Sequence, residues 1–401
     1  MNIKIEKSIA RGEINAPPSK SYAHRLLIAS SLARGQNTVL GVSDSVDMQA
    51  TLECLSALGI EYSKKADRVS INGGASYKES AIFNCHESGS TLRFFIPIAL
   101  VICKEATFIG TPRLMSRGIE IYEEIFKKQN IEYEKTETTL KIKGSLKADT
   151  FFVRGDISSQ FITGLLFALP LLEKDSVIKL TTPLQSSKYV DVTIDVLKQF
   201  GIEIEQRKNE IYVSGNQKYK PQNVIVEADA SNSAFLEAFN VLGGDVSIKG
   251  LNKNTLQPDG IYKKLFLELK NKTPTIDLSS CPDLGPITFA LSACLNGAEF
   301  IGTKRLKIKE SDRCEAMKAE LEKFGVKVEI GENSAIVYGG TFKKPNRTLD
   351  GHNDHRIVMA LSVISTLCGA EIAGCEAVNK SYPNFFDDIS KLGIALKKSE
   401  V

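Results

Sequence analysis

The stretch "TLECLSALGIEYSKKADRVSINGG", residues 51–74, joins a helix pattern to a hairpin pattern. Leu52, Leu55 and Leu58 recur at helical spacing, and Gly59 follows them as a helix-ending glycine does. Apolar and polar residues then alternate on both sides of a polar turn, which is typical of two antiparallel strands. The stretch therefore predicts a helix followed by two strands, which is an α/β arrangement.

The same pattern recurs along the chain. Its further copies are "IYEEIFKKQNIEYEKTETTLKIKG" from Ile121, "TIDVLKQFGIEIEQRKNEIYVSG" from Thr193, "MKAELEKFGVKVEIGENSAIVYGG" from Met317 and the truncated "DDISKLGIALKKSEV" from Asp387. The residues expected to end the five helices are Gly59, Asn130, Gly201, Gly325 and Gly393. They stand about 70 residues apart, except for one double gap, in which "IYKKLFLELKNKTPTIDLSS" (261–280) fits as a degenerate sixth copy.

Six such units are each too small to close a core alone, so we expect two domains of three units, divided near residues 222–229. The alternative is a chance recurrence of helix, glycine and strand, a succession that is common in α/β proteins. The regular period favours a true repeat.

The composition describes an ordinary globular protein. The chain has 401 residues, 42% of them hydrophobic and 25% charged, with a formal net charge of +3. That charge is too small to indicate nucleic-acid binding, and no basic stripe interleaved with aromatic residues occurs. The longest apolar run, near residues 94–103, is about half of a membrane span. The N-terminus alternates like a strand and has no apolar signal-peptide core, so we expect a cytoplasmic protein.

Cysteines and histidines give little sign of a metal or a redox centre. The eight cysteines form no Cys-x-x-Cys pair, and most lie in apolar surroundings, so we interpret them as reduced core residues. His352 and His355 have no third histidine or cysteine nearby that would complete a metal site. Neither a Walker loop nor Gly-x-Gly-x-x-Gly after a strand is present. We expect neither a metal nor an organic cofactor.

Several helix starts carry cations where the helix dipole favours acids. "PPSKSYAHR" (17–25) puts Lys20, His24 and Arg25 at the opening of an apolar helix. Four other polar-to-apolar starts carry Arg93, Gln160, Arg313 and Arg356. Serine, asparagine and aspartate at such places are often plain N-caps, but the cations are not explained that way. Free N–H groups and a guanidinium together bind phosphate or carboxylate, so the sequence predicts a strongly anionic small ligand.

With these motifs the chain resembles the enolpyruvyl transferase family, and within it the enzymes that act on shikimate 3-phosphate. The resemblance runs nearly end to end through "PPSKSYAHR" (17–25), "SGSTLR" (88–93), "PRLMSR" (112–117), "SSQF" (158–161), "CPDLGP" (281–286), "KESDR" (309–313), "NDHR" (353–356) and "KSYP" (380–383). It implies two domains, each of three βαβαββ units around a pseudo-threefold axis, with helix N-termini facing a cleft. It also implies that residues 1–17 join the C-terminal half, so the expected domains are 18–224 and 1–17 plus 225–401.

The resemblance further implies the reaction. The family transfers the enolpyruvyl group of phosphoenolpyruvate to the 5-hydroxyl of shikimate 3-phosphate and releases inorganic phosphate, a step of the shikimate pathway. Each substrate carries a phosphate and a carboxylate, so the pair brings a charge of about −5 to −6. Such a charge accounts for the cations at the helix starts.

At matching positions the resemblance implies two sets of binding residues. Phosphoenolpyruvate would be held by Lys20, Gly89, Arg117, Gln160, Arg313, Arg356 and Lys380, and shikimate 3-phosphate by Lys20, Ser21, Arg25, Ser158, Ser159, Gln160, Ser186, Asp283 and Lys309. Gly89 would allow close approach of the backbone. In "QSSKYVD" (185–191), Ser187 remains an alternative to Ser186.

The chemistry needs a group that handles the proton of the 5-hydroxyl and one that protonates the methylene carbon. The resemblance assigns Asp283 to the hydroxyl, with Glu310 and Lys20 as candidates at the methylene and the bridging oxygen. Each acid also has a structural interpretation. Asp283 lies in the turn-like "SSCPDLGP" and could cap backbone, and Glu310 could be an ordinary first-turn acid.

Two positions depart from the family pattern. Glu87 stands where an amide is common, and Arg305 stands where asparagine is frequent beside the substrate. An extra acid near phosphoenolpyruvate weakens anion binding unless it points away or pairs with a cation. Both departures therefore bear on substrate affinity and on sensitivity to glyphosate.

Two other functions are disfavoured by the sequence. The sister transferase that acts on UDP-N-acetylglucosamine uses a cysteine on a loop near "GTPRLMSR" (110–117), where this chain has none; the nearest, Cys103, lies in an apolar segment. A polyanion-binding or RNA-end-processing module is disfavoured by the modest charge and the lack of stacking aromatics. We expect a monomer that binds neither nucleic acid nor membrane.

Overall fold

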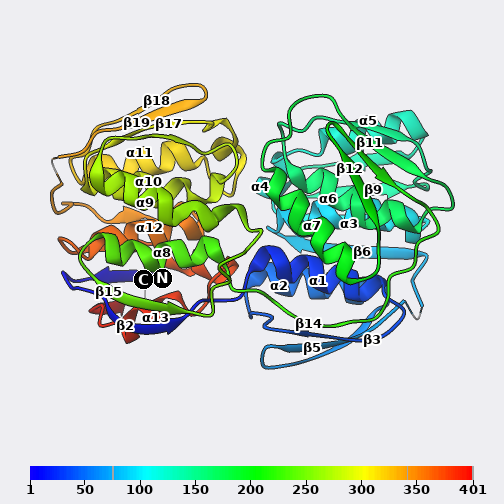
Figure 1. Cartoon of the computed structure of the whole chain (residues 1–401), viewed down its shortest axis with the longest axis horizontal. Coiled ribbons are helices and arrows are strands. Elements are labelled where there is room, and N and C mark those ends of the chain that lie inside the picture. The colour runs from blue at the N-terminus through cyan, green and yellow to red at the C-terminus, as the bar shows by residue number, and fades with distance from the viewer. Residues whose placement is uncertain (75, 341, 400–401) are drawn as a thin grey trace. The chain divides into compact units, whose positions relative to one another are not determined.

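A computed structural model of the chain describes residues 1–74, 76–340 and 342–399. The chain divides into two compact units (Figure 1): the middle unit, Pro18–Glu227, and the terminal unit, which takes residues 1–17 and everything from Ala228. The second division thus follows residue 227 rather than 224. β14 (Asn223–Ile225) pairs in parallel with β3 (Gly35–Leu40), and the N–H of Val226 donates to Leu40 O, so this segment stays with the middle unit.

The described residues of the middle unit form three four-stranded sheets of one design. Their strand orders are β14-β3-β5-β4, β6-β7-β9-β8 and β10-β11-β13-β12. In each sheet the first two strands are parallel and the last two form an antiparallel hairpin. The remaining strands are β4 (Glu61–Lys65), β5 (Arg68–Gly73), β6 (Ser80–His86), β7 (Glu105–Gly110), β8 (Glu132–Lys135), β9 (Thr139–Lys143), β10 (Thr150–Val153), β11 (Ser176–Leu180), β12 (Ile204–Arg207) and β13 (Glu210–Val213).

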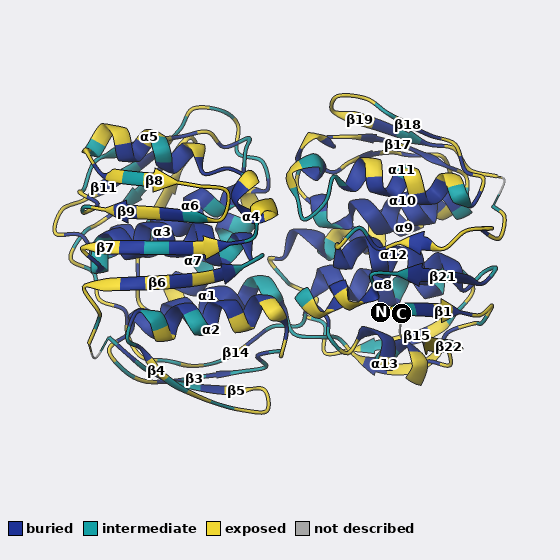
Figure 2. Cartoon of the chain, turned by 180° about the vertical axis from the view of Figure 1, so that it is seen from behind, coloured by how far each residue is buried: buried dark blue, intermediate teal, exposed yellow. Residues whose placement is uncertain are grey.

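The helices of the middle unit are of two kinds. α1 (Lys20–Leu32), α3 (Gly89–Ile102) and α6 (Ser159–Ala168) are buried along most of their length, as Figure 2 shows for α3. Helices apolar on all sides belong inside a core. The others are α2 (Val46–Ala57), α4 (Pro112–Ser116), α5 (Glu120–Gln129), α7 (Ser187–Gln199) and η1 (Leu169–Leu171). α2, α5 and α7 bury one face and leave the other toward solvent.

In the terminal unit the described residues form two four-stranded sheets, β20-β21-β1-β22 and β16-β17-β19-β18, and the two-stranded sheet β15-β2. Its strands are β1 (Asn2–Ile5), β2 (Arg11–Asn15), β15 (Asp245–Lys249), β16 (Thr275–Asp277), β17 (Ala298–Ile301), β18 (Val328–Ile330), β19 (Ser334–Val337), β20 (Leu349–Asp350), β21 (Ala370–Ala373) and β22 (Leu396–Ser399). Its helices are α8 (Ala230–Val241), α9 (Tyr262–Asn271), α10 (Gly285–Cys294), α11 (Arg313–Lys323), α12 (His355–Ser365), α13 (Phe385–Lys391), η2 (Pro258–Ile261), η3 (Pro282–Leu284), η4 (Lys304–Ile308) and η5 (Cys375–Lys380). α8, α10 and α12 pack together at the centre of this unit.

The structure confirms the repeat. All five residues predicted to end helices lie in the left-handed region, with φ of 95° at Gly59, 56° at Asn130, 77° at Gly201, 82° at Gly325 and 87° at Gly393. This conformation ends a helix by satisfying its last carbonyl groups.

The prediction of the sixth copy is confirmed for its helix only. The predicted helix is present as α9, but the hairpin expected after it is wrong. The chain runs from Asn271 almost directly into β16, which pairs in parallel with β17 of the next sheet. The segment between α9 and β16 is too short for two strands. The sheet of this sixth copy therefore holds only β15 and β2 among the described residues, and β2 comes from the N-terminal segment of the chain.

Within the described ranges, the helices are all too short or too polar to cross a bilayer.

Candidate active site

Asp283 of η3 lies among three cations of the terminal unit. Its Oδ1 is 3.2 Å from Lys309 Nζ and 2.8 Å from Arg313 Nη1, and its Oδ2 is 3.1 Å from Arg356 Nη2. Glu310 joins the cluster because its Oε2 accepts from Arg313 Nη2 at 2.8 Å. The structure thus brings together five residues that the sequence predicted from three separate motifs.

Arg313 is the centre of this cluster. It is the first residue of α11 and only 1% of its side chain is exposed. Its Nε donates to Asp354 Oδ2 at 2.8 Å and its Nη2 to Asp354 Oδ1 at 3.3 Å. Asp354 is fully buried and also caps α12, since its Oδ1 accepts from the N–H of Arg356 at 2.9 Å. A guanidinium this deeply buried needs such carboxylate partners.

The cluster fixes the charge of its members. Burial alone would raise the pKa of the Asp283 carboxyl, but Arg356, Lys309 and Arg313 hold that pKa well below its usual range. Burial lowers the pKa of the Lys309 ammonium to about 8; Asp283 opposes this shift, whereas Arg313 and Arg305 reinforce it. Asp283 is therefore an anion at neutral pH, and Lys309 is a cation that titrates in the mildly alkaline range.

Lys20 opens α1 in the middle unit. Ser19 caps this helix, because its Oγ accepts from the N–H of Tyr22. The ammonium of Lys20 lies 2.7 Å from Oδ2 of Asp47, a mostly buried acid in the first turn of α2. Sequence reasoning missed Asp47, which looks there like an ordinary first-turn acid.

Arg25, predicted to bind shikimate 3-phosphate, is an internal link in this structure. Its Nε donates to Thr193 Oγ1, its Nη1 to Ser21 O, and its Nη2 to Thr163 Oγ1 and Tyr189 O. These bonds use four of its five N–H groups. Arg25 therefore ties α1 to α6 and α7, and one N–H of Nη1 is left for another contact.

Gly89 and Arg117 are close neighbours. A Cβ at position 89 would lie 2.8 Å from Arg117 Nη1, so the missing side chain makes room for the guanidinium. Arg93, which the resemblance did not assign to a substrate, fixes the surroundings: its Nη1 donates to Gln160 Oε1 at 2.7 Å and its Nη2 to Arg117 O at 2.8 Å. The amide of Gln160 also donates to Ser90 Oγ at 2.9 Å.

The predicted serines stand at helix starts. Ser21 is in the first turn of α1, Ser158 caps α6 by accepting from the N–H of Gln160, and Ser159 is the first residue of α6. Ser186 has a φ of 55° and is buried just before α7, whereas Ser187 is exposed. These positions leave both serines open as ligands.

Lys380 ends η5, where its Nζ donates to Asn353 O at 2.6 Å. Each unit thus holds its own group of candidate residues: Lys20, Ser21, Arg25, Gly89, Arg117, Ser158, Ser159, Gln160 and Ser186 in the middle unit, and Asp283, Lys309, Glu310, Arg313, Arg356 and Lys380 in the terminal unit.

Comparison with known proteins decides the family. The sequence profile of EPSP synthase (3-phosphoshikimate 1-carboxyvinyltransferase) matches residues 5–389. The chain belongs to the EPSP synthase family. It is 41% identical to the 3-phosphoshikimate 1-carboxyvinyltransferase of Clostridium kluyveri and 39% identical to that of Clostridioides difficile, each over 98% of this chain and 97% of the relative.

Solved structures agree in fold. The chain is similar to EPSP synthase from Acinetobacter baumannii, with a TM-score of 0.80 and 22% identity over the full length of both chains. It is also similar to the enolpyruvyl transferase NikO from Streptomyces tendae, with a TM-score of 0.77 and 12% identity over 99% of this chain and 98% of that one. At these identities the likeness shows the enolpyruvyl transferase fold alone.

Glu87 and Arg305, the two residues that depart from the family pattern, lie in different surroundings. Glu87 is partly exposed and directly precedes Ser88, the cap of α3. Arg305 is largely buried in η4, and its Nη1 donates to Ser279 O at 3.3 Å. Arg305 thus adds a cation near Lys309, one of the EPSP synthase positions expected to bind substrate.

The cysteines are free thiols, as predicted, and six of the eight are buried. Burial raises the pKa of Cys103 to about 11, so this thiol is a poor nucleophile at neutral pH. No cluster of metal-ligating side chains occurs in the part of the chain that the structure describes.

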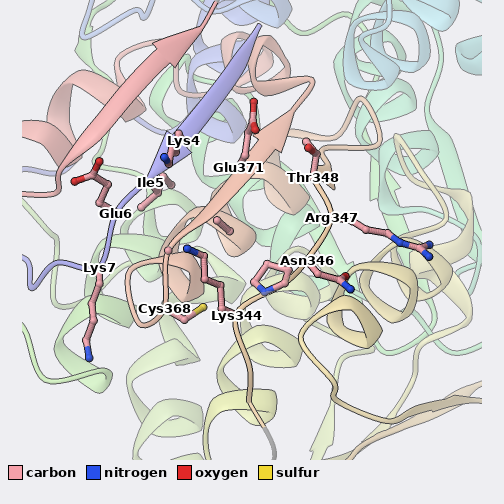
Figure 3. Close-up of a pocket in the computed structure, with 13 residues that line it drawn as sticks. Lys4, Ile5, Glu6, Lys7, Lys344, Asn346, Arg347, Thr348, Cys368 and Glu371 are labelled. Atoms are coloured by element: carbon pink, nitrogen blue, oxygen red, sulfur yellow. The ribbon is translucent and has the colours of Figure 1, made fainter.

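A surface cavity of about 530 Å³ lies apart from the candidate residues of the EPSP synthase site (Figure 3). It is lined by residues 4–7, 344–348 and 368–371 of the terminal unit. Both signs of charge line it, because the lining includes Lys4 and Lys344 as well as Glu6 and Glu371. None of the predicted site residues lies among its lining residues.

Proposed function

We propose that this chain is a 3-phosphoshikimate 1-carboxyvinyltransferase. It transfers the enolpyruvyl group of phosphoenolpyruvate to the 5-hydroxyl of shikimate 3-phosphate and releases inorganic phosphate, a step toward the aromatic amino acids. Membership of the EPSP synthase family over nearly the whole chain supports this function. The single observation that carries it is the cluster in which Lys309, Arg313 and Arg356 converge on Asp283.

Phosphoenolpyruvate is assigned to cations at helix starts and to the groups beside them. Arg356 suits this role because its buried Nη1 has no hydrogen-bond partner among the described residues. The Nε of Arg117 is likewise buried and unpartnered within the described ranges. Guanidinium groups with spare donors bind phosphate and carboxylate well. The full proposed set is Lys20, Gly89, Arg117, Gln160, Arg313, Arg356 and Lys380.

Shikimate 3-phosphate is assigned to the serine-rich helix starts of the middle unit together with two residues of the terminal unit. Hydroxyl and backbone N–H groups at a helix start match a phosphate. The proposed set is Lys20, Ser21, Arg25, Ser158, Ser159, Gln160, Ser186, Asp283 and Lys309. Arg25 contributes mainly by holding α1, α6 and α7 together, because most of its donors are used internally.

The reaction proceeds by addition and elimination. The 5-oxygen attacks the central carbon of phosphoenolpyruvate and loses its proton to Asp283, while the methylene carbon gains a proton from Glu310. The tetrahedral adduct then returns a proton from its new methyl group to Glu310, and the bond from the central carbon to the phosphate oxygen breaks, with Lys20 donating a proton to that oxygen. General acid–base groups contribute about 10²–10⁴-fold each to such steps.

The pKa of Asp283 changes when substrates bind. Surrounded by Lys309, Arg313 and Arg356, it is a weak base, because its pKa lies well below the usual range. The substrate phosphate and carboxylate groups compete for the same cations. As Arg313 and Arg356 turn to the substrates, the pKa of Asp283 rises toward the range of a working general base.

The test is phosphate release from phosphoenolpyruvate with two acceptors in parallel, shikimate 3-phosphate and UDP-N-acetylglucosamine. Release that depends on shikimate 3-phosphate supports the proposal, and release only with the sugar nucleotide overturns it. We also propose that the enzyme works as a cytoplasmic monomer without nucleic acid, in line with its formal charge of +3. Size-exclusion chromatography with light scattering tests the monomer.

A further inference from the structure

A tight turn of left-handed backbone leads into α12. The N–H of Asp354 donates to Gly351 O at 2.9 Å, and the two residues between them, His352 and Asn353, have φ of 48° and 49°. Turns with two positive φ values are normally built from glycine, asparagine or aspartate. A histidine in this conformation is held there by contacts with its surroundings.

α11 supplies contacts at both ends of the turn. Glu320, whose side chain is 1% exposed, accepts from the N–H of Asp350 at 2.9 Å through Oε2, and its Oε1 lies 2.9 Å from His352 Nε2. Two helical turns earlier, on the same face of α11, Arg313 binds Asp354. The single helix α11 therefore contacts both the start and the end of the turn.

The turn sets the position of proposed substrate ligands. Its carbonyl at Asn353 accepts from Lys380 Nζ at 2.6 Å. Its last residue, Asp354, caps α12 at the N–H of Arg356. A shift of the turn would therefore move Lys380 and Arg356, both assigned to phosphoenolpyruvate.

We propose that His352 is a positioning residue for the phosphoenolpyruvate subsite, acting through Glu320 to hold the turn that orients Lys380 and Arg356. The inference rests on the proposed function. It adds a residue outside the substrate-binding set and gives that residue a specific effect, on phosphoenolpyruvate and not on shikimate 3-phosphate.

The charges around the imidazole make this contact depend on pH. Glu320 and Lys323 face it from α11, and Asp350 faces it from β20. The hydrogen bond to Glu320 raises the pKa of His352 above its ordinary value, although burial opposes this. Burial alone would raise the pKa of Glu320, but the bonds from His352 and Lys323 lower it. The ion pair therefore persists to higher pH than an isolated histidine would allow, and it loses its cation as the pH rises through the raised pKa of His352.

Steady-state kinetics of three variants test the role. His352→Asn keeps a residue that tolerates the left-handed backbone but is too short to reach Glu320. His352→Gln keeps a neutral donor. Lys323→Gln is the matched control, because Lys323 binds the same carboxylate at 2.8 Å and donates to Thr348 O rather than to the turn.

We expect His352→Asn to raise KM for phosphoenolpyruvate about tenfold, the scale of a lost hydrogen bond between charged groups, while KM for shikimate 3-phosphate changes less than about twofold. His352→Gln should give an intermediate KM, and its ratio to wild type should shrink above the pKa of His352. Lys323→Gln should leave both KM values near wild type. A folded His352→Asn variant with unchanged KM for phosphoenolpyruvate, or with both KM values raised equally, would overturn the proposal.

A second measurement separates this inference from the proposed function. Titration of the histidine ring signals by NMR in the wild type should show a raised pKa for His352 that returns toward its ordinary value in Glu320→Gln. An ordinary pKa in the wild type would contradict the ion pair. Inactive wild-type enzyme with a raised His352 pKa would refute the proposed function and with it the assignment to phosphoenolpyruvate, while the His352–Glu320 contact itself would stand.

Discussion

Arg313 and Asp354 form a fully buried ion pair, with Arg313 Nε 2.8 Å from Asp354 Oδ2 and at most 1% of either side chain exposed. Asp354 was predicted only as part of a helix-starting motif, yet it anchors the guanidinium that binds both Asp283 and Glu310. The pair therefore links the packing of α11 against α12 to the chemistry of the site.

Replacing Asp354 by asparagine should destabilise the protein. The change leaves Arg313 buried with one charge partner fewer, and breaking a buried pair in this way costs about 3–5 kcal/mol. Denaturant unfolding measures the loss. Glu79→Gln is the control, because it breaks the exposed Lys104–Glu79 pair and should hardly change stability. Equal unfolding midpoints for the Asp354 and Glu79 variants would show that the buried pair is not an anchor.

Replacing Asp283 by asparagine should lower kcat by about a hundredfold or more, the scale for a general acid–base residue, and leave the fold intact. KM for phosphoenolpyruvate should not rise, because the neutral amide no longer competes for Arg313 and Arg356. Asp277→Asn is a matched control: this exposed acid accepts from Ser279 N–H at 2.8 Å, close in sequence to Asp283. Near-normal turnover of Asp283→Asn would remove it from the mechanism.

The affinity for shikimate 3-phosphate should fall at alkaline pH. Lys309 is a cation below its pKa of about 8, and above that pH it loses the charge that attracts the substrate phosphate. KM for shikimate 3-phosphate should therefore rise with pH above about 8. Lys309→Arg keeps its charge, so the rise should move to higher pH in that variant. An identical pH profile in wild type and variant would rule out Lys309 as the titrating group.

Replacing Gly89 by alanine should weaken phosphoenolpyruvate binding without unfolding the protein. The new Cβ would lie 2.8 Å from Arg117 Nη1, and the flexible arginine, rather than the backbone, would give way. We expect KM for phosphoenolpyruvate to rise about tenfold, the scale of one lost charged hydrogen bond. In an Arg117→Ala background, Gly89→Ala should add little, because its effect passes through Arg117. Fully additive effects would mean that Gly89 acts in another way.

The repeat was predictable because its signals are local. A helical stripe, a left-handed residue such as Asn130 or Gly201 and an alternating hairpin each lie within a few residues. The hairpin predicted for the sixth copy of the repeat is wrong because the sheet of that copy depends on a distant part of the chain. Its sheet pairs β15 with β2, which lies more than two hundred residues away along the chain, and no local pattern announces that pairing.

The candidate site was predictable in part. Motifs located the cations and acids, but not which acid pairs with which cation. Lys20 meets Asp47 across 27 residues and Arg313 meets Asp354 across 41, and these contacts arise only when helix starts come together in the fold. The motif likewise did not indicate that Arg25 links helices inside the middle unit, because its partners come from distant parts of the sequence. His352 was considered only as a metal ligand, and its contact with Glu320 follows from the left-handed turn.

The central claim is that the enolpyruvyl group, and not the phosphoryl group, is transferred. The most direct test is to supply phosphoenolpyruvate labelled with ¹⁸O in the bridging oxygen, together with shikimate 3-phosphate, and to analyse the released phosphate by mass spectrometry. Addition and elimination break the bond between carbon and the bridging oxygen, so the label should leave with the phosphate, and the shikimate product should gain the enolpyruvyl group. Unlabelled phosphate, with the ¹⁸O retained in pyruvate, would mean cleavage at phosphorus and would contradict the account.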